Sequence, residues 1–257
     1  MTKLNKYMTI GIGVLTVALL TNVAASERKS QPQITNVSAV ANISQTNDFR
    51  TIYPERVVEL FTSQGCSSCP PANKFASDLA QRDATSLVLS YGVTYWDYLG
   101  WEDTFADQSF TARQRQYMKA LKTPNIYTPQ MIINGTDHSP RYKDAEVRVK
   151  NFSTERGTAT LSLSQSGDLI VKGNVPAGNL LSIVRFTPGL KTVDVKAGEN
   201  TGRTLELENV VEDVLIAEWD GEETLISSEL EAGQAYAALF QAPETLEVLT
   251  AVVLKQE

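Results

Sequence analysis

The sequence contains little cysteine and almost no histidine. Its 257 residues include two cysteines, Cys66 and Cys69, and one histidine, His138. A structural zinc site needs four ligands, most often Cys and His. Because the single histidine lies far along the chain from the cysteines, the composition argues against a zinc site. His138 follows an Asn-Gly turn signal and is expected to be exposed, with no functional role.

Basic residues are also in short supply. Lys and Arg number 23 against 30 Asp and Glu, which gives a formal net charge of −7 at pH 7. Proteins that bind nucleic acid present a basic surface to the phosphates. The charge balance therefore predicts that nucleic acid is not a partner.

Long hydrophobic runs are missing as well. The longest apolar stretch, residues 8–20, falls short of the roughly 20 residues that a membrane-spanning helix requires. It follows Lys3 and Lys6 and precedes the small residues 23–25, a pattern typical of a secretory signal peptide. We predict a signal peptide over residues 1–25, export to the periplasm or the exterior, and no membrane span after cleavage. The alternative is an uncleaved anchor.

The next part of the chain changes character twice. Residues 26–52 are polar and lack hydrophobic periodicity, which predicts a flexible leader. Residues 57–61 form a nearly continuous apolar run, as expected of a strand buried on both faces. A helical pattern and a second apolar strand, residues 87–91, follow. We predict an α/β domain over residues 53–155.

Beyond residue 157 the pattern is that of a β protein. About eight short, alternating segments are separated by turn residues, at a spacing typical of a β-sandwich. We therefore predict an all-β, sandwich-like domain over residues 156–257. The predicted fold class is α/β with this β domain appended.

The two cysteines form a C-x-x-C motif, Cys66-Ser67-Ser68-Cys69, between the first strand and the helix. A helix start offers unpaired amide hydrogens and the positive end of the helix dipole, which stabilise a thiolate. Cys66 would then attack a disulfide and Cys69 would resolve the intermediate. Two other interpretations stay open: a structural disulfide, and ligation of Cu(I) by two thiolates.

Four segments of the sequence are distinctive. They are VVELFTSQGCSSCPP (57–71), YWDYLGW (95–101), YTPQMIING (127–135) and GENTGRTLELENVV (198–211). Together they resemble a secreted bacterial family that contains a thioredoxin-like domain and carries a domain-of-unknown-function label. The resemblance implies a thioredoxin-like fold with a β-rich domain appended, and it implies no established activity.

The resemblance adds one expected feature and removes another. In thioredoxin-like proteins a loop that ends in a cis-proline lies against the C-x-x-C motif, and Thr128-Pro129 matches that position. A cis bond there would expose the preceding backbone to a substrate strand, whereas a trans-proline would simply begin a strand. Members of the family carry a His and an Asp where this sequence has Gly92 and Thr94. That departure places His-assisted catalysis and any metal role in doubt.

Glu59 lies mid-strand among apolar residues, and two roles are open for it. A buried carboxylate is costly unless it is neutralised, paired or functional. It could accept the Cys69 proton during exchange, as an acid beneath the cysteines does in thioredoxin-like enzymes. Alternatively, Glu59 forms a salt bridge at the edge of a sheet.

The aromatic segment after the second strand also has two interpretations. Tyr95, Trp96 and Trp101 could line a groove that holds an apolar peptide. They could instead bury the junction between the two predicted domains.

These observations predict an exported thiol–disulfide oxidoreductase. Its catalytic residues would be Cys66, Cys69, Thr128, Pro129 and Glu59, its partners protein or peptide thiols and disulfides, and no cofactor is expected. The alternatives are a non-catalytic binding or scaffold protein whose vicinal disulfide is structural, and a Cu(I)-handling protein.

Overall fold

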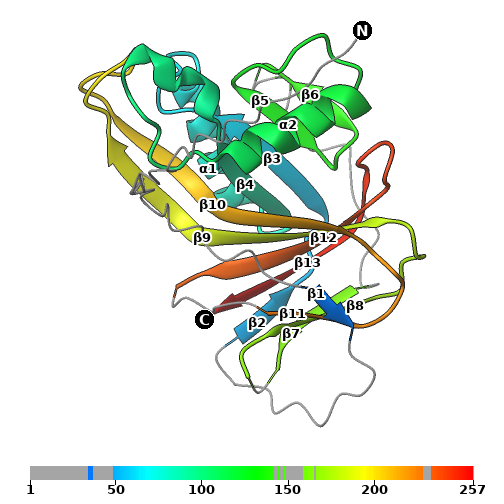
Figure 1. Ribbon diagram of the computed structural model, residues 1–257. Coiled ribbons are helices and arrows are strands. Elements are labelled where there is room, and N and C mark those ends of the chain that lie inside the picture. The colour runs from blue at the N-terminus through cyan, green and yellow to red at the C-terminus, as the bar shows by residue number, and fades with distance from the viewer. Residues whose placement is uncertain are drawn as a thin grey trace, which may run out of the picture. The chain divides into compact units, whose positions relative to one another are not determined.

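A computed structural model describes residues 34–36, 49–141, 144, 148, 159–164, 166–227 and 233–256. Residues 32–257 form one compact unit of mixed α/β structure, dominated by a nine-stranded and a four-stranded sheet (Figure 1). The predicted signal peptide lies outside the described residues. No helix in the described part of the chain has the length and apolar character needed to cross a membrane.

The part of the nine-stranded sheet that carries the C-x-x-C motif is built around β3 (Arg56–Thr62). Strand β4 (Ser86–Gly92) pairs with it in parallel, after the crossover helix α1 (Pro70–Arg82). On its other side β3 pairs antiparallel with β5 (Gln130–Ile133), which pairs with β6 (Asp137–Ser139). The apolar run of β3 is continuous because both of its faces are covered.

Two helices cover the two faces of β3. Val58 and Leu60 pack in one apolar cluster with residues of α1. Val57 and Phe61 point the other way, into a cluster that contains Tyr117 of α2 (Gln108–Ala120). This alternation follows from the two-residue period of a strand. The alternation determines which of the two helices each side chain of β3 can contact.

The C-terminal half of the chain completes the same sheet. Its strands continue in the order β4, β10, β9, β12, β13 and β2, and β10 pairs in parallel with β4 through Val210 and Ser90. The bounds of these strands are β10 (Thr204–Glu218), β9 (Leu180–Asp194), β12 (Ala235–Gln241), β13 (Val248–Gln256) and β2 (Phe49–Ile52). Strands from both sides of residue 155 therefore belong to one sheet.

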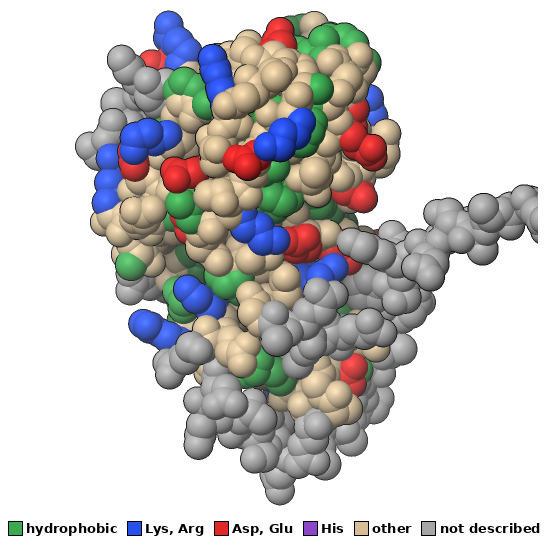
Figure 2. All heavy atoms as spheres, turned by 90° about the vertical axis from the view of Figure 1, so that its left-hand side faces the viewer, with side chains coloured by type: hydrophobic (Ala, Val, Ile, Leu, Met, Phe, Trp, Pro, Cys, Tyr) green, Lys and Arg blue, Asp and Glu red, His purple; other side chains and the backbone are tan. Residues whose placement is uncertain are grey.

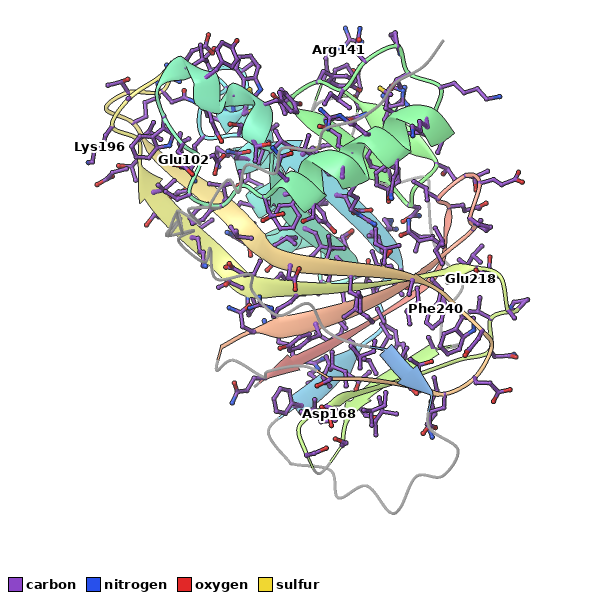
Figure 3. The ribbon with its side chains drawn as sticks, viewed as in Figure 1. Glu102, Arg141, Asp168, Lys196, Glu218 and Phe240 are labelled. Carbon is purple, nitrogen blue, oxygen red and sulfur yellow. A yellow bond between two sulfur atoms is a disulfide. The ribbon has the colours of Figure 1, made fainter. Side chains whose placement is uncertain are left out.

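The four-stranded sheet lies against this C-terminal half. Its order is β1 (Ile34–Asn36), β11 (Thr224–Ile226), β8 (Leu169–Gly173) and β7 (Ala159–Leu163). Its apolar residues form one cluster with Trp219 and Phe240. The two rings pack edge to face, and their centroids are 5.0 Å apart. Figure 3 shows Phe240 between the strands of the two sheets.

Two boundary predictions need correction. The predicted division at residue 155 does not separate two sheets, because β10 covers the side of β4 that would otherwise be an open edge. The predicted flexible leader over residues 26–52 contains β1 and β2, which pair with β11 and β13. Polar strands at the sheet margins have no hydrophobic periodicity to reveal them.

The hairpin formed by β9 and β10 has the longest strands in the described chain, 15 residues each. Its tip reaches the loop that precedes α2, since a Cβ added at Gly198 would lie 3.5 Å from the Cβ of Trp101. Figure 3 shows Lys196 of the tip and Glu102 of that loop at the same end of the sheet. The hairpin thus carries residues of the C-terminal half to the end of the sheet where the C-x-x-C motif lies.

Candidate functional site

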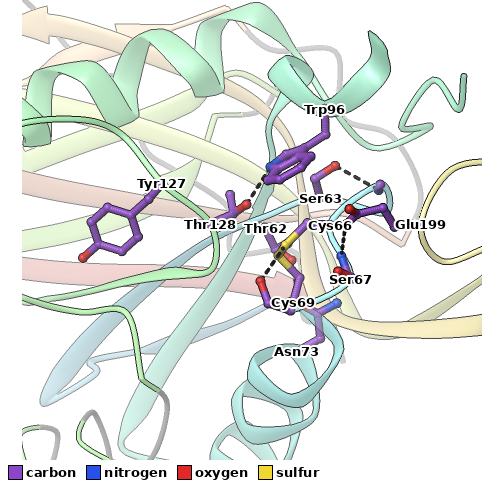
Figure 4. The surroundings of a disulfide bond; sticks show 12 residues. Thr62, Ser63, Cys66, Ser67, Cys69, Asn73, Trp96, Tyr127, Thr128 and Glu199 are labelled. Atoms are coloured by element: carbon purple, nitrogen blue, oxygen red, sulfur yellow. Dashed lines mark hydrogen bonds between the residues drawn. A yellow bond between two sulfur atoms is a disulfide. The ribbon is translucent and has the colours of Figure 1, made fainter. Parts of the chain in front are cut away.

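The candidate site is a disulfide between Cys66 and Cys69, in the loop that joins β3 to α1 (Figure 4). Both cysteines are fully buried, whereas Ser67 and Ser68 between them are exposed. The Ser68 hydroxyl lies 3.3 Å from Cys66 Sγ. Because a disulfide sulfur has no hydrogen to give, the hydroxyl is the donor.

The backbone amides around the disulfide are largely engaged already. The Cys66 amide donates to the Ser63 carbonyl at 3.2 Å, and the Cys69 amide donates to the Cys66 carbonyl at 3.1 Å. The first two residues of α1 are prolines and have no amide hydrogen. The next two amides of α1 donate to the Cys69 carbonyl at 2.9 and 3.0 Å. The helix start therefore offers a thiolate fewer unpaired donors than the motif alone predicts.

The tip of the β9–β10 hairpin supplies two side chains to the C-x-x-C loop. The Ser67 amide donates to Glu199 Oε2 at 3.0 Å. Asn200 Nδ2 donates to the carbonyls of Gln64 and Cys66, both at 2.9 Å, and Asn200 is fully buried. Sequence reasoning assigned no role to these two residues. The signal that could have found them is the segment GENTGR, which stood out as distinctive without a function.

A second loop lies beside the disulfide and contains a cis peptide bond between Thr128 and Pro129. The predicted cis-proline is thus confirmed. A groove of about 540 Å³ is lined by residues of both loops: Ser68, Pro71, Thr128, Pro129, Pro140, Arg141 and Asp144. This arrangement brings the cysteine loop and the cis-proline loop to one surface depression.

The three aromatic residues predicted to line a groove lie in different surroundings. Trp96 is half-buried, and its Nε1 donates to Thr128 Oγ1 at 2.7 Å, so it supports the cis-proline loop. Trp101 donates to Gln64 Oε1 at 2.8 Å and packs on the apolar cluster of the β9–β10 hairpin. Tyr95 packs against the core between β3 and α2, and burial raises its pKa to about 12. Of the three, Trp96 contacts the cis-proline loop through a hydrogen bond, while Trp101 packs at the junction with the C-terminal half.

Glu59 forms a buried ion pair. Arg113 of α2 donates to its two carboxylate oxygens, from Nε at 2.6 Å and from Nη2 at 3.0 Å, and the Tyr117 hydroxyl donates to it as well. Glu59 shares the face of β3 that points to α2, away from α1. Glu59 is thus salt-bridged, as the second interpretation had it, but not at a sheet edge, because β3 lies between β4 and β5. Its carboxylate is paired with a guanidinium and faces away from the helix that begins after Cys69.

The family described as "Protein of unknown function (DUF1223)" matches residues 57–242. The chain belongs to this family. The matched DUF1223 region includes the C-x-x-C motif, the cis-proline loop and the hairpin tip. No curated protein matches the chain.

Two solved structures resemble this DUF1223 protein. One is the crystal structure of a protein from Agrobacterium tumefaciens, with 28% sequence identity and a TM-score of 0.62, covering 79% of this chain and 95% of that chain. The other is HBP35 of Porphyromonas gingivalis, with 12% identity and a TM-score of 0.52, covering 77% of this chain and 74% of that one. At that identity HBP35 shows a likeness of fold alone.

The position where the DUF1223 protein departs from the expected family pattern has no room for a side chain. A Cβ at Gly92 would lie 2.6 Å from the Phe105 carbonyl oxygen and 2.8 Å from the Ala106 nitrogen. Gly92 also forms an isolated parallel bridge with Ala106. Contacts under 3.0 Å essentially never occur for real Cβ atoms. A histidine at position 92 would therefore displace the segment before α2.

Proposed function

We propose that this protein is a thiol–disulfide oxidoreductase with a thioredoxin-like site, exported to the cell envelope. The observation that supports it most is the placement of Cys66 and Cys69 between a buried strand and a helix start, while Ser68 of their loop lines one groove with the cis Thr128-Pro129 bond. The apolar N-terminal segment supports export. The function needs no organic cofactor.

Written from the reduced protein, the proposed exchange passes two electrons to a substrate disulfide, and the same steps run in reverse when the disulfide form is the oxidant. The Cys66 thiolate attacks one substrate sulfur, forms a mixed disulfide and releases the other sulfur as a thiolate that takes up a proton. The Cys69 thiolate then attacks Cys66 Sγ, closes the Cys66–Cys69 disulfide and releases the second substrate thiol. The substrate backbone would lie in the groove beside Thr128.

A second candidate, a binding protein with a structural disulfide, is favoured by one observation. Cys66 and Cys69 are fully buried, and the hairpin tip is bonded to the loop between them. A structural disulfide typically has a reduction potential below about −300 mV, whereas the potentials of catalytic pairs lie between about −270 and −120 mV. The two candidates therefore differ in a measurable equilibrium.

The test equilibrates the oxidised protein with a series of glutathione and dithiothreitol buffers and counts free thiols. The oxidoreductase proposal predicts reversible reduction within the range of these buffers. It also predicts that a Cys69→Ser variant traps mixed disulfides on Cys66 when incubated with a peptide disulfide. The matched control is Cys66→Ser, which keeps one thiol but lacks the attacking one and should trap far less.

Two results would contradict the proposal. One is a disulfide that stays oxidised in the dithiothreitol buffers as well as in the glutathione buffers, and the other is equal trapping by the two single-cysteine variants. Either result would favour the binding protein.

A further inference from the structure

Glu199, in the C-terminal half of the chain, contacts the C-x-x-C motif with its negatively charged carboxylate. Its Oε2 accepts the Ser67 amide hydrogen at 3.0 Å, one residue after Cys66 (Figure 4). Hydrogen bonding from Ser67 lowers the pKa of Glu199, so its carboxylate is charged at neutral pH. The hairpin tip is anchored there by Asn200, which bonds the carbonyls on both sides of Gly65.

This contact removes a donor that a thiolate at Cys66 could use. The amides of Cys66 and Cys69 already donate to backbone carbonyls, and Ser67 donates to Glu199. Two prolines follow Cys69 and have no amide hydrogen. The Ser68 hydroxyl is a neutral donor to Cys66 Sγ. A thiolate at Cys66 would thus have a carboxylate bonded to the next residue, Ser67, and few unpaired donors among the amides described above.

Other charged groups reach the same loop. The Asp103 carboxylate accepts the Gln64 amide hydrogen at 2.7 Å, and burial raises the pKa of Asp103 to about 6. Two cations lie on the hairpin tip: Lys196 pairs with Asp194 at 3.5 Å, while the Arg203 guanidinium donates to Asn200 Oδ1 at 3.0 Å. Asp103 acts in the same direction as Glu199 on a thiolate, while Arg203 opposes both.

From these contacts we propose that Glu199 is a positioning residue that favours the disulfide form of Cys66–Cys69, so that the reduced pair is an electron donor. The inference rests on the proposed function and adds its direction. A like charge and the loss of a donor both disfavour the Cys66 thiolate, and a less stable reduced form makes a dithiol a stronger reductant.

In this direction a second partner must reduce the Cys66–Cys69 disulfide after each reaction. The reduced pair passes two electrons and two protons to a substrate disulfide, which becomes two thiols, while Cys66 and Cys69 become a disulfide. A dithiol donor of lower reduction potential then restores the two thiols and is itself oxidised to a disulfide.

The experiment compares Glu199→Gln with Asp194→Asn in the full-length protein. Gln keeps an oxygen that can accept the Ser67 hydrogen and removes the charge. Asp194 lies on the same hairpin, is exposed and accepts from the Thr204 hydroxyl at 2.6 Å, so its substitution removes an equal charge away from the motif. Circular dichroism checks that the variants keep the fold.

Two quantities are measured. For Glu199→Gln the equilibrium constant for reduction by dithiothreitol should rise about three- to tenfold, a change of about 15 to 30 mV in potential. In a Cys69→Ser background, the pKa of the Cys66 thiol, followed by its rate of alkylation against pH, should fall by about 0.5 to 1 unit on substitution of Glu199. Asp194→Asn should change each quantity by less than half as much.

The outcomes separate this inference from the proposed function. Unchanged values for Glu199→Gln, or equal shifts for Asp194→Asn, overturn the role of Glu199 even if the pair exchanges with substrates. Absence of mixed disulfides on Cys66 overturns the proposed function, whereas the alkylation pKa still decides whether Glu199 acts on Cys66.

Discussion

Asp103 is a buried carboxylate that supports the loop before Cys66. It is 5% exposed, accepts the amide hydrogens of Gln64 and Phe105, and burial raises its pKa to about 6. Its pKa in the unfolded chain is near the ordinary value of 3.8. The folded protein therefore holds the Asp103 proton up to a higher pH than the unfolded chain does.

The sign of the pH dependence follows from that difference. Asp103 contributes stability that is fully present below pH 3.8 and is lost as the pH rises through about 6. Asn does not ionise, so Asp103→Asn does not lose stability as the pH rises. The free energy of unfolding of the variant, minus that of the wild type, should therefore increase between pH 4 and 7 by up to about 3 kcal/mol. Urea unfolding of both proteins at four pH values across this range measures the difference. A difference that stays constant with pH would contradict the assignment.

Single residues also show what sequence reasoning can reach in this site. The disulfide partners were predictable from the C-x-x-C motif, and the cis Thr128-Pro129 bond was predictable from the resemblance to thioredoxin-like proteins. Glu199 and Asn200 were not predictable from their own sequence surroundings, since their role comes from contacts with residues more than 130 positions away. Glu59 looked like a candidate acid until its partner Arg113, which is 54 positions away, was located.

At the scale of elements, the β9–β10 hairpin links the two halves of the chain at the candidate site. Asn200 is the buried contact of its tip and satisfies two carbonyl groups of the C-x-x-C loop. Buried carbonyls without partners cost free energy. The hairpin tip is therefore expected to stabilise the loop and the whole fold together.

Asn200→Ala should lower the free energy of unfolding by about 1 to 3 kcal/mol, because the Gln64 carbonyl loses this donor and the Cys66 carbonyl keeps only the Cys69 amide. It should also speed the reduction of the disulfide by dithiothreitol, since the loop loses its anchor. Thr201→Ala is the control in the same turn: its exposed hydroxyl donates to the Gly198 carbonyl, and the change should cost less than about 0.5 kcal/mol. Similar urea midpoints and reduction rates for the two variants would refute the anchoring role.

The elements themselves were predictable to different degrees. The apolar run of β3 and the helix after the cysteines were expected, because their periodicity is strong. The order of strands in the sheet was not, since the sequence of β10 does not reveal that its neighbours are β9 and β4. Strand β12, most of β13 and the first half of β9 are buried on both faces, so in those parts buried and exposed residues do not alternate.

At the scale of the whole molecule, one core joins the segments that the sequence suggested were separate domains. Phe61 and Tyr91 lie in the same cluster as Val184 and Val211 of the C-terminal half. Arg113 donates to Ser182 and Gln241 from that half as well as to Glu59.

The surface carries charged side chains of both signs. Figure 2 shows this for one face, on which no large patch of a single sign is seen.

We predict that residues 53–155 do not fold when expressed alone. The fragment would expose the edge of β4 and the cluster around Phe61, and it would leave Arg113 without two of its partners. It should show no cooperative unfolding transition in urea, monitored by tryptophan fluorescence and circular dichroism. Residues 32–257, which form one compact unit, are the control and should unfold cooperatively. A cooperative transition for the short fragment would instead support the boundary near residue 155.

The contact between Ser67 and Glu199 joins positions 132 residues apart, whereas β3, α1 and β4 are consecutive in the chain. Contacts between distant positions carry a larger loop-closure cost, so the first contacts among β3, α1 and β4 can form transiently before the hairpin tip reaches the cysteines. The two thiols are then uncovered during the early steps of folding. With only two cysteines in the chain, oxidation at that time can form just one intramolecular bond, so premature oxidation within the chain produces no scrambled isomer.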